Sequence, residues 1–113
     1  MILGIESTAH TLSFGVVDDD GRAKPSVSNL FRPKEGGIHP REAADHHSDV
    51  AGDLLSQVML KNSISKSDIT AIAFSQGPGL GPCLRVGASV ARALANSWEI
   101  PWELQSACVV PSA

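Results

Sequence analysis

The sequence lacks an excess of positive charge. Its 9 Lys and Arg residues stand against 12 Asp and Glu residues, which gives a formal net charge of -3. A domain that binds a nucleic-acid backbone unaided normally carries a basic excess. Any RNA contact must therefore be local or supplied by a partner.

Long apolar segments and a cysteine framework are also missing. No apolar run approaches the roughly 20 residues of a membrane-spanning helix, and no basic segment precedes an apolar one at the N-terminus. Cys83 and Cys108 are too few for a disulfide framework, and their spacing is not that of a metal motif. These absences predict a cytoplasmic protein without membrane association.

The composition that remains is that of an ordinary globular domain. The chain has 113 residues, enough for one modest domain or a fragment of one, but not for two. Apolar residues make up 42% and charged residues 19%, so nothing indicates disorder. We find no internal repeat and no low-complexity segment.

Strand-like patterns open the chain. Residues 1–7 and 11–21 read as two strands joined by a tight turn, which predicts an N-terminal β-hairpin. A third strand is expected within residues 23–31, before the proline- and glycine-rich stretch RPKEGGIHPR. A fourth strand is expected at residues 68–74, DITAIAF, which are rich in β-branched side chains.

Two helices are predicted from apolar spacing. The first covers residues 41–62 with Pro40 at its start, and the second covers residues 84–96 with Pro82 in its first turn. The apolar face of the first comprises Ala43, Val50, Ala51, Leu54 and Val58. In the second, Val86, Val90, Ala91 and Leu94 share a face, while Gly87, Ala88 and Ala95 permit close approach to a sheet. The order β-β-β-α-β-α predicts an α/β fold whose mixed sheet carries an antiparallel hairpin.

Polar residues gather at the predicted hairpin turn. The stretch GIESTAHT places Glu6, Ser7, Thr8 and His10 there, where hydroxyl and backbone N–H groups could surround an anion or a phosphate. Ser and Thr are also common in turns, so the same residues could simply complete the hydrogen bonds of the turn.

Two adjacent histidines lie on the first predicted helix. His47 falls on its apolar stripe and His46 at the edge of that stripe. His47 could be a buried, hydrogen-bonded histidine beside a solvated His46, or it could position a substrate near a cleft. A metal site that also uses His39 is conceivable, but the spacing of the three is not specific.

A glycine loop separates the fourth strand from the second helix. Residues 77–82, GPGLGP, lie where unpaired N–H groups and a helix dipole favour an anion, and Arg85 could add charge. The loop lacks the Lys-Ser/Thr ending of a P-loop and the glycine spacing of a Rossmann fingerprint. The alternative is a rigid turn that brings the strand and the helix close together.

Three segments together resemble a known family. LGIESTAHT, GGIHPREAADHH and AFSQGPGLGPCLRVGASVARALA are similar, in order and spacing, to the N-terminal lobe of the KEOPS/TsaD family of tRNA threonylcarbamoyladenosine synthases, most closely its archaeal branch. An older name for the family is O-sialoglycoprotein endopeptidase-like. The resemblance implies one incomplete lobe of an actin-like ATPase (ASKHA) fold. It also implies transfer of a threonylcarbamoyl group from threonylcarbamoyl-AMP to the adenosine 3′ of the anticodon.

The resemblance carries expectations for the site. The nucleotide and substrate cleft would include Glu6, Ser7, Thr8, His47, Gly77, Gly79 and Gly81. No residue is expected to be a covalent nucleophile, because the attacking amine belongs to the tRNA. In the intact family the cofactors are ATP or threonylcarbamoyl-AMP and a divalent metal, iron or zinc. The implied partners are tRNA and the KEOPS subunits, a small kinase and a dimeric subunit.

The resemblance ends at Pro101. The family continues with a Val-Gly-Val-like strand, a metal-binding His-x-x-x-His motif and a second lobe, whereas residues 102–113 read WELQSACVVPSA. Reading the codons of Trp102 and Glu103 one base earlier can give Val-Gly-Val, so we expect a lobe at 1–101 and a divergent, out-of-frame tail at 102–113. We expect this chain to bind no metal, to be inactive alone and to self-associate through an exposed sheet edge.

Two other readings stay open. The chain could be a non-catalytic, metal-free paralogue that serves as a binding partner of the true enzyme, but such paralogues generally lack the HPREAADHH segment. A metalloprotease, which the older family name suggests, has no zinc-protease motif to support it.

Overall fold

The computed structural model describes residues 1–33, 36–37 and 39–106. Its elements, in order, are β1 (Ile2–Glu6), β2 (Thr11–Val17), β3 (Val27–Leu30), α1 (Pro40–Lys61), the 3₁₀ turn η1 (Lys66–Asp68), β4 (Ala71–Gly77), α2 (Gly81–Trp98) and β5 (Trp102–Ser106). The predicted order β-β-β-α-β-α is confirmed, and η1 and β5 are added to it.

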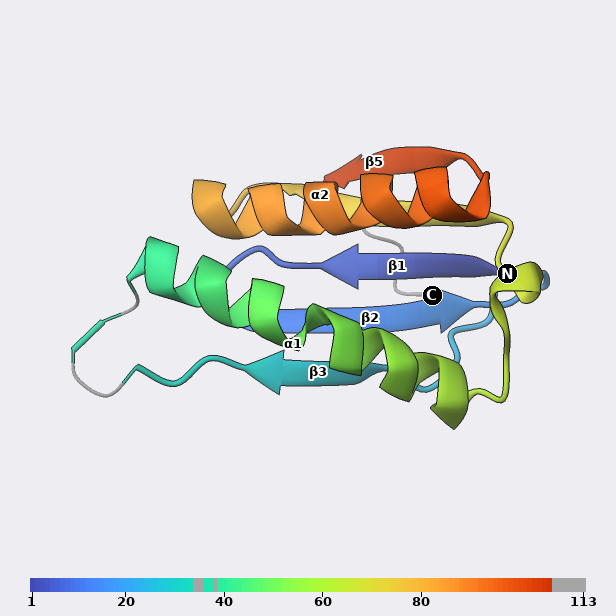
Figure 1. The fold of residues 1–113 in the computed structure, drawn as a ribbon, viewed down its shortest axis with the longest axis horizontal. Coiled ribbons are helices and arrows are strands. Elements are labelled where there is room, and N and C mark those ends of the chain that lie inside the picture. The colour runs from blue at the N-terminus through green and yellow to red at the C-terminus, as the bar shows by residue number, and fades with distance from the viewer. Residues whose placement is uncertain (34–35, 38, 107–113) are drawn as a thin grey trace.

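The strands form one mixed sheet in the order β3-β2-β1-β4-β5 (Figure 1). β2 pairs antiparallel with both β1 and β3, which confirms the N-terminal hairpin. β1 pairs parallel with β4, and β4 pairs parallel with β5. Because α1 and α2 each lead into a strand of the parallel part, both helices pack on the sheet.

Both helices cover the same face of the sheet (Figure 1). Alternate residues of the three central strands point toward them and are buried, as the period of two requires. These residues are Leu3, Ile5, Leu12, Phe14, Val16, Ile72 and Phe74. They form one core with Ala51, Leu54 and Val58 of α1 and with Ala91 and Ala95 of α2.

The most buried face of α2 differs from the predicted one. Its buried residues are small ones, four positions apart: Cys83, Gly87, Ala91 and Ala95. The larger Val86, Val90 and Leu94 are only partly buried at its flanks. The reason is close approach, because a Cβ on Gly87 would collide with the side chain of Ser7 at the end of β1.

At one end of the sheet, β1 and β4 finish and α1 and α2 begin. β1 ends at Glu6 and β4 at Gly77, while α1 starts at Pro40 and α2 at Gly81, all toward the left of Figure 1. The loops after parallel strands therefore meet the first turns of both helices. In α/β folds this is the edge where ligands bind.

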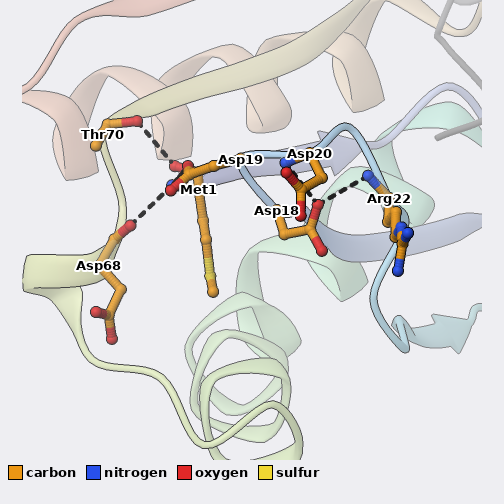
Figure 2. A network of polar contacts seen from close by, with 7 residues as sticks. All are labelled: Met1, Asp18, Asp19, Asp20, Arg22, Asp68 and Thr70. Atoms are coloured by element: carbon orange, nitrogen blue, oxygen red, sulfur yellow. Dashed lines mark hydrogen bonds and ion pairs between the residues drawn. The ribbon is translucent and has the colours of Figure 1, made fainter.

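The opposite end is closed by the chain's own N-terminus (Figure 2). The Met1 ammonium donates to Asp19 Oδ1 and to the Asp68 carbonyl, each at 3.0 Å, and Thr70 N donates to the Met1 carbonyl at 2.8 Å. These contacts join the β2–β3 turn, η1 and the start of β4 around β1.

The β2–β3 turn is itself held by one carboxylate. Asp18 Oδ1 accepts hydrogen bonds from the backbone N–H groups of Arg22 and Asp20, each at 2.9 Å (Figure 2). The bond from Arg22 is the main cause that lowers the pKa of Asp18 below its ordinary value.

None of the helices among the described residues has the length and apolar character needed to cross a membrane.

Candidate functional site

The loop between β1 and β2, residues 7–10, is fixed residue by residue to other segments. The Ser7 N–H donates to the Ser75 hydroxyl of β4 at 3.2 Å, within the buried part of the molecule. The Thr8 carbonyl accepts a hydrogen bond from Leu80 N in the glycine loop at 2.7 Å. The first half of this loop is therefore tied to the end of β4 and to the segment that follows it.

The second half of the loop is tied to α1 and to the segment after β3. The Ala9 carbonyl accepts a hydrogen bond from His47 Nε2 at 2.7 Å, and the His10 carbonyl accepts one from Phe31 N at 2.6 Å. Four separate segments thus hold four consecutive residues. A loop fixed in this way loses little further conformational entropy when a ligand binds.

Three amides of the loop remain available. Within the part of the chain that the structure describes, no acceptor pairs with the backbone N–H groups of Thr8, Ala9 or His10. Consecutive unpaired N–H groups in a turn can form a concavity suited to an anion. The Thr8 hydroxyl lies beside them and donates to Glu6 Oε1 at 2.6 Å, so two of the four predicted turn side chains meet at this site.

The Ser7 side chain faces inward. It is fully buried, and its hydroxyl is the buried side-chain polar atom that has no hydrogen-bond partner within the described residues. Its Oγ lies against Gly87 of α2. Ser7 therefore contributes to the site through its backbone and through the close packing of β1 on α2.

The glycine loop packs directly on the β1–β2 loop. A Cβ added to Gly79 would lie 2.5 Å from the Thr8 carbonyl oxygen and 2.9 Å from Thr8 Cα, so a larger residue does not fit here. Gly77 ends β4 and Gly81 begins α2, with Pro82 in the first turn as predicted. The rigid-turn interpretation is therefore partly right, but what Gly79 brings together is two loops.

A guanidinium lies at the start of α2. Arg85 Nη1 would be 3.7 Å from a Cβ on Gly81, so the side chain folds back over the first residue of the helix. The first turn of α2 contains no acidic residue. Positive charge at a helix N-terminus is unfavourable on its own and becomes favourable when an anion binds there.

His47 is a buried and hydrogen-bonded histidine, as one of the two interpretations holds, and it also reaches the loop. That interpretation also expected a solvated His46, and this part of it is wrong. Its Nδ1 lies 2.9 Å from His47 Nδ1 and its Nε2 lies 2.8 Å from Asn29 Oδ1. Its ring is only partly exposed, because it packs against Phe31 with ring centroids 5.5 Å apart.

The three histidines do not form a metal site. Among the described residues, which include His39, no group of three His, Cys, Asp or Glu side chains is arranged to hold a metal ion. Both ring nitrogens of His46 and of His47 are already engaged.

Cys83 is not suited to act as a nucleophile. It is fully buried at the start of α2, where it packs with Ala43 and Ala44 of α1, and burial raises the pKa of its thiol. A buried thiol of raised pKa stays protonated and unreactive near neutral pH. Cys108 lies outside the described residues.

Comparison with known proteins gives a family for this geometry. The family model described as "TsaD: tRNA N6-adenosine threonylcarbamoyltransferase" matches residues 25–104. The chain belongs to the TsaD family. This match confirms the resemblance to the TsaD family that the sequence motifs indicated.

Curated TsaD relatives cover almost the whole chain. The tRNA N6-adenosine threonylcarbamoyltransferase of Pyrobaculum arsenaticum is 50% identical over 102 residues, which are 89% of this chain and 30% of that protein. The protein of the same name from Methanopyrus kandleri is 49% identical over 108 residues, or 95% of this chain and 31% of that protein. Both sources are archaeal, as expected. The chain spans about 30% of the length of these TsaD relatives.

Solved structures show the same fold. YeaZ from Pseudomonas aeruginosa superimposes with a TM-score of 0.73 at 20% identity, over 93% of this chain and 42% of that one. RuvC from Thermus thermophilus gives a TM-score of 0.53 at 14% identity, over 93% of this chain. The TsaD chain is thus one part of an actin-like fold.

Sequence reasoning missed two residues of this candidate site. Ser75 supplies the acceptor for Ser7 N, and Asn29 supplies the partner of His46. Ser75 carried a signal, because it is a polar residue at the end of an otherwise apolar run. Asn29 carried none, since a polar residue on an edge strand is ordinary.

Proposed function

We propose that this chain forms the N-terminal lobe of a tRNA N6-adenosine threonylcarbamoyltransferase. In this role the loop at residues 7–10 and the glycine loop at residues 77–81 would bind the phosphate groups of ATP or threonylcarbamoyl-AMP. The observation that supports it best is the loop at residues 7–10: four segments fix its backbone, and no acceptor among the described residues pairs with the amides of Thr8, Ala9 and His10.

The charges around the loops suit a phosphate. Arg85 lies over Gly81 at the positive end of the α2 dipole, and Leu80, which precedes Gly81, donates to the Thr8 carbonyl of the β1–β2 loop. Glu6 is the one acidic side chain of the loop motif, and it accepts the Thr8 hydroxyl. We propose that this bond orients the Thr8 hydroxyl at the edge of the phosphate site.

The chain supplies positioning and no covalent chemistry. The adenosine amine of the tRNA would attack the threonylcarbamoyl carbonyl, and the adenylate would leave as AMP. Fixed N–H donors and a guanidinium would stabilise the negative charge on the leaving phosphate. In this proposal Gly77, Gly79 and Gly81 line the cleft, and His47 supports it from α1.

The family's metal does not fit the described residues, which offer no set of ligands for iron or zinc. We propose that the metal, the second wall of the cleft and most of the tRNA contact are supplied by protein beyond this chain, in a cytoplasmic KEOPS-type assembly. A chain of these residues alone would then be inactive.

Calorimetric titration of ATP into the chain tests the proposal. Gly79→Ala should weaken or abolish ATP binding, because the added methyl group pushes the glycine loop away from Thr8. Gly52→Ala is the matched control, since Gly52 lies on the exposed side of α1 with nothing within 4 Å of its Cβ position. Equal ATP binding by the two variants would contradict the proposal.

A transfer assay addresses the paralogue alternative. A longer protein that carries this lobe should transfer threonylcarbamoyl to tRNA and lose the transfer with Gly79→Ala. If that protein binds ATP and never transfers, it is a binding partner of another enzyme.

A further inference from the structure

A series of hydrogen bonds connects β3, through α1, to the loop at residues 7–10. It consists of Asn29, His46, His47 and the Ala9 carbonyl. His47 is fully buried, and His46 is shielded by Phe31. Phe31 N is itself bonded to the next carbonyl of the loop, that of His10. The position of the loop therefore depends on where the protons of the two rings reside.

The Ala9 carbonyl determines the first proton. A carbonyl oxygen only accepts, so His47 Nε2 must carry hydrogen. In a neutral His47, Nδ1 is then a bare acceptor. His46 Nδ1 lies 2.9 Å away and must carry the hydrogen of that bond. Neutral His46 is thus held in its Nδ1–H form, the reverse of the form that His47 takes.

Asn29 can serve two charge states. When His46 is neutral, its Nε2 is an acceptor and the Asn29 amide nitrogen can donate to it. When His46 is protonated, Nε2 donates and Asn29 Oδ1 accepts, which is the orientation that the structure has. A half-turn of the Asn29 side-chain amide exchanges these two hydrogen bonds with His46 Nε2. The bond from His47 to Ala9 is the same in both.

A second proton does not fit. With both rings charged, both Nδ1 atoms would carry hydrogen and would face each other at 2.9 Å. No carboxylate bonds to His47 to compensate its charge within the described residues. The groups that surround His46 are Asp49 and His47 on α1, with the uncharged Asn29 and Phe31 from β3 and its following segment.

We infer that His46 and His47 are positioning residues for the loop at residues 7–10. They hold this loop in one place while the histidine pair is neutral or carries one positive charge, and they release it when the pair takes up a second proton. The link to phosphate binding rests on the proposed function. The assignment of protons to the ring nitrogens does not rest on the proposed function, because it follows from the hydrogen bonds of the ligand-free chain.

The direction of the pH effect can be worked out. Burial, and then the neighbouring His47, lower the pKa of His46, while Asp49 opposes them. A histidine whose pKa is lower in the folded state takes up its proton more readily when unfolded. Folding stability should therefore weaken as the pH falls below about 6.5, the ordinary value for histidine, while the loop stays in place until the pair takes up a second proton.

Ring ¹⁵N chemical shifts of the ligand-free chain test the inference. Above pH 7.5 we expect His46 as the Nδ1–H tautomer and His47 as the Nε2–H tautomer. The exposed His10 and His39 are internal controls and should show the ordinary mixture. An Nε2–H tautomer at His46 would overturn the inference whether or not the chain binds nucleotide.

Three variants, one at Asn29 and two at His47, separate positioning from simple structural support. Asn29→Asp, on an exposed edge-strand position, can only accept, so it should raise the pKa of His46 by roughly one unit. An unchanged pKa of His46 in this variant would contradict the relay. His47→Gln keeps a donor for Ala9 and should preserve the His10 amide resonance, while His47→Leu should shift it. If both His47 variants leave that resonance in place, the loop is not held by this bond.

Discussion

Ser7 and Ser75 show how differently two buried hydroxyls can contribute to stability. Ser75 Oγ satisfies the Ser7 N–H at 3.2 Å, whereas Ser7 Oγ has no partner within the described residues and presses on Gly87. A buried hydroxyl without a hydrogen bond costs free energy, and a buried amide that loses its acceptor costs about as much. Substitutions at the two serines should therefore have opposite effects.

Ser75→Ala should lower the free energy of unfolding by about 1–3 kcal/mol, since it leaves the Ser7 N–H unpaired. Ser7→Ala should leave it unchanged or raise it by up to about 1 kcal/mol, since it removes an unpaired hydroxyl. Urea denaturation of both variants beside the wild type provides the measurement. A Ser7→Ala variant as unstable as Ser75→Ala would mean that the Ser7 hydroxyl has a partner.

Asp18 gives a pH dependence at the other end of the molecule. Its pKa is lowered in the folded state, chiefly by the bond from Arg22 N. Its contribution to stability is therefore complete above the unfolded pKa of about 3.8–3.9 and is lost as the pH falls through the lower folded value. Asp18→Asn keeps an acceptor without the charge. The stability of this variant should fall less than that of the wild type between pH 5 and pH 2.5 in denaturation experiments, and parallel curves would contradict this.

At the scale of elements, the sequence predicted which segments form helices and strands better than it predicted which face of a helix is buried. The spacing of apolar residues was enough for α1, and Pro40 and Pro82 marked the first turns of both helices. The predicted close approach of Gly87 and Ala95 to the sheet is confirmed, but the sequence did not predict that small residues form the most buried face of α2. That face depends on how near α2 approaches β1 at Gly87. β5 was missed because the tail after Pro101 was read as divergent, yet its backbone pairs in parallel with β4. Residues 107–113 of that tail lie outside the described residues.

The close packing of α2 can be tested on one helix. Ala91 is fully buried, whereas Ala93 is exposed. Ala91→Val should destabilise the fold by about 1–3 kcal/mol because no room exists for two more methyl groups. Ala93→Val adds the same atoms at a similar helix-propensity cost and should change stability by less than about 1 kcal/mol. Equal losses would show that α2 does not pack as closely as its small residues indicate.

In the candidate site, too, some residues could be proposed from the sequence and others could not. Glu6, Thr8, His47 and Gly79 could be proposed from sequence, and the structure brings them to adjoining loops. The residues that hold their chain neighbours are Ser75 in β4, Asn29 in β3 and Phe31 just after β3, and only the sheet order places these segments nearby. Such contacts depend on register and topology, which residue spacing does not determine.

At the scale of the whole molecule, the helices cover one face of the sheet, and β3 and β5 form its edges (Figure 1). Ile2 on the other face is 42% exposed, and Leu30 on the β3 edge is 38% exposed. We propose that the isolated chain self-associates through the β3 edge. Sedimentation velocity should then show association that grows with concentration. Leu30→Lys should reduce it, and a monomer at all concentrations would contradict the proposal.

The backbone amides of residues 8–10 are proposed to form an anion site. The decisive measurement is a titration of the ¹⁵N-labelled chain with ATP, followed by amide chemical shifts. We expect saturable shifts at Thr8, Ala9 and His10 and in the glycine loop. The Asp18–Arg22 turn, at the opposite end of the sheet, should be unaffected. Amides of Thr8, Ala9 and His10 that do not move at saturating ATP would contradict it.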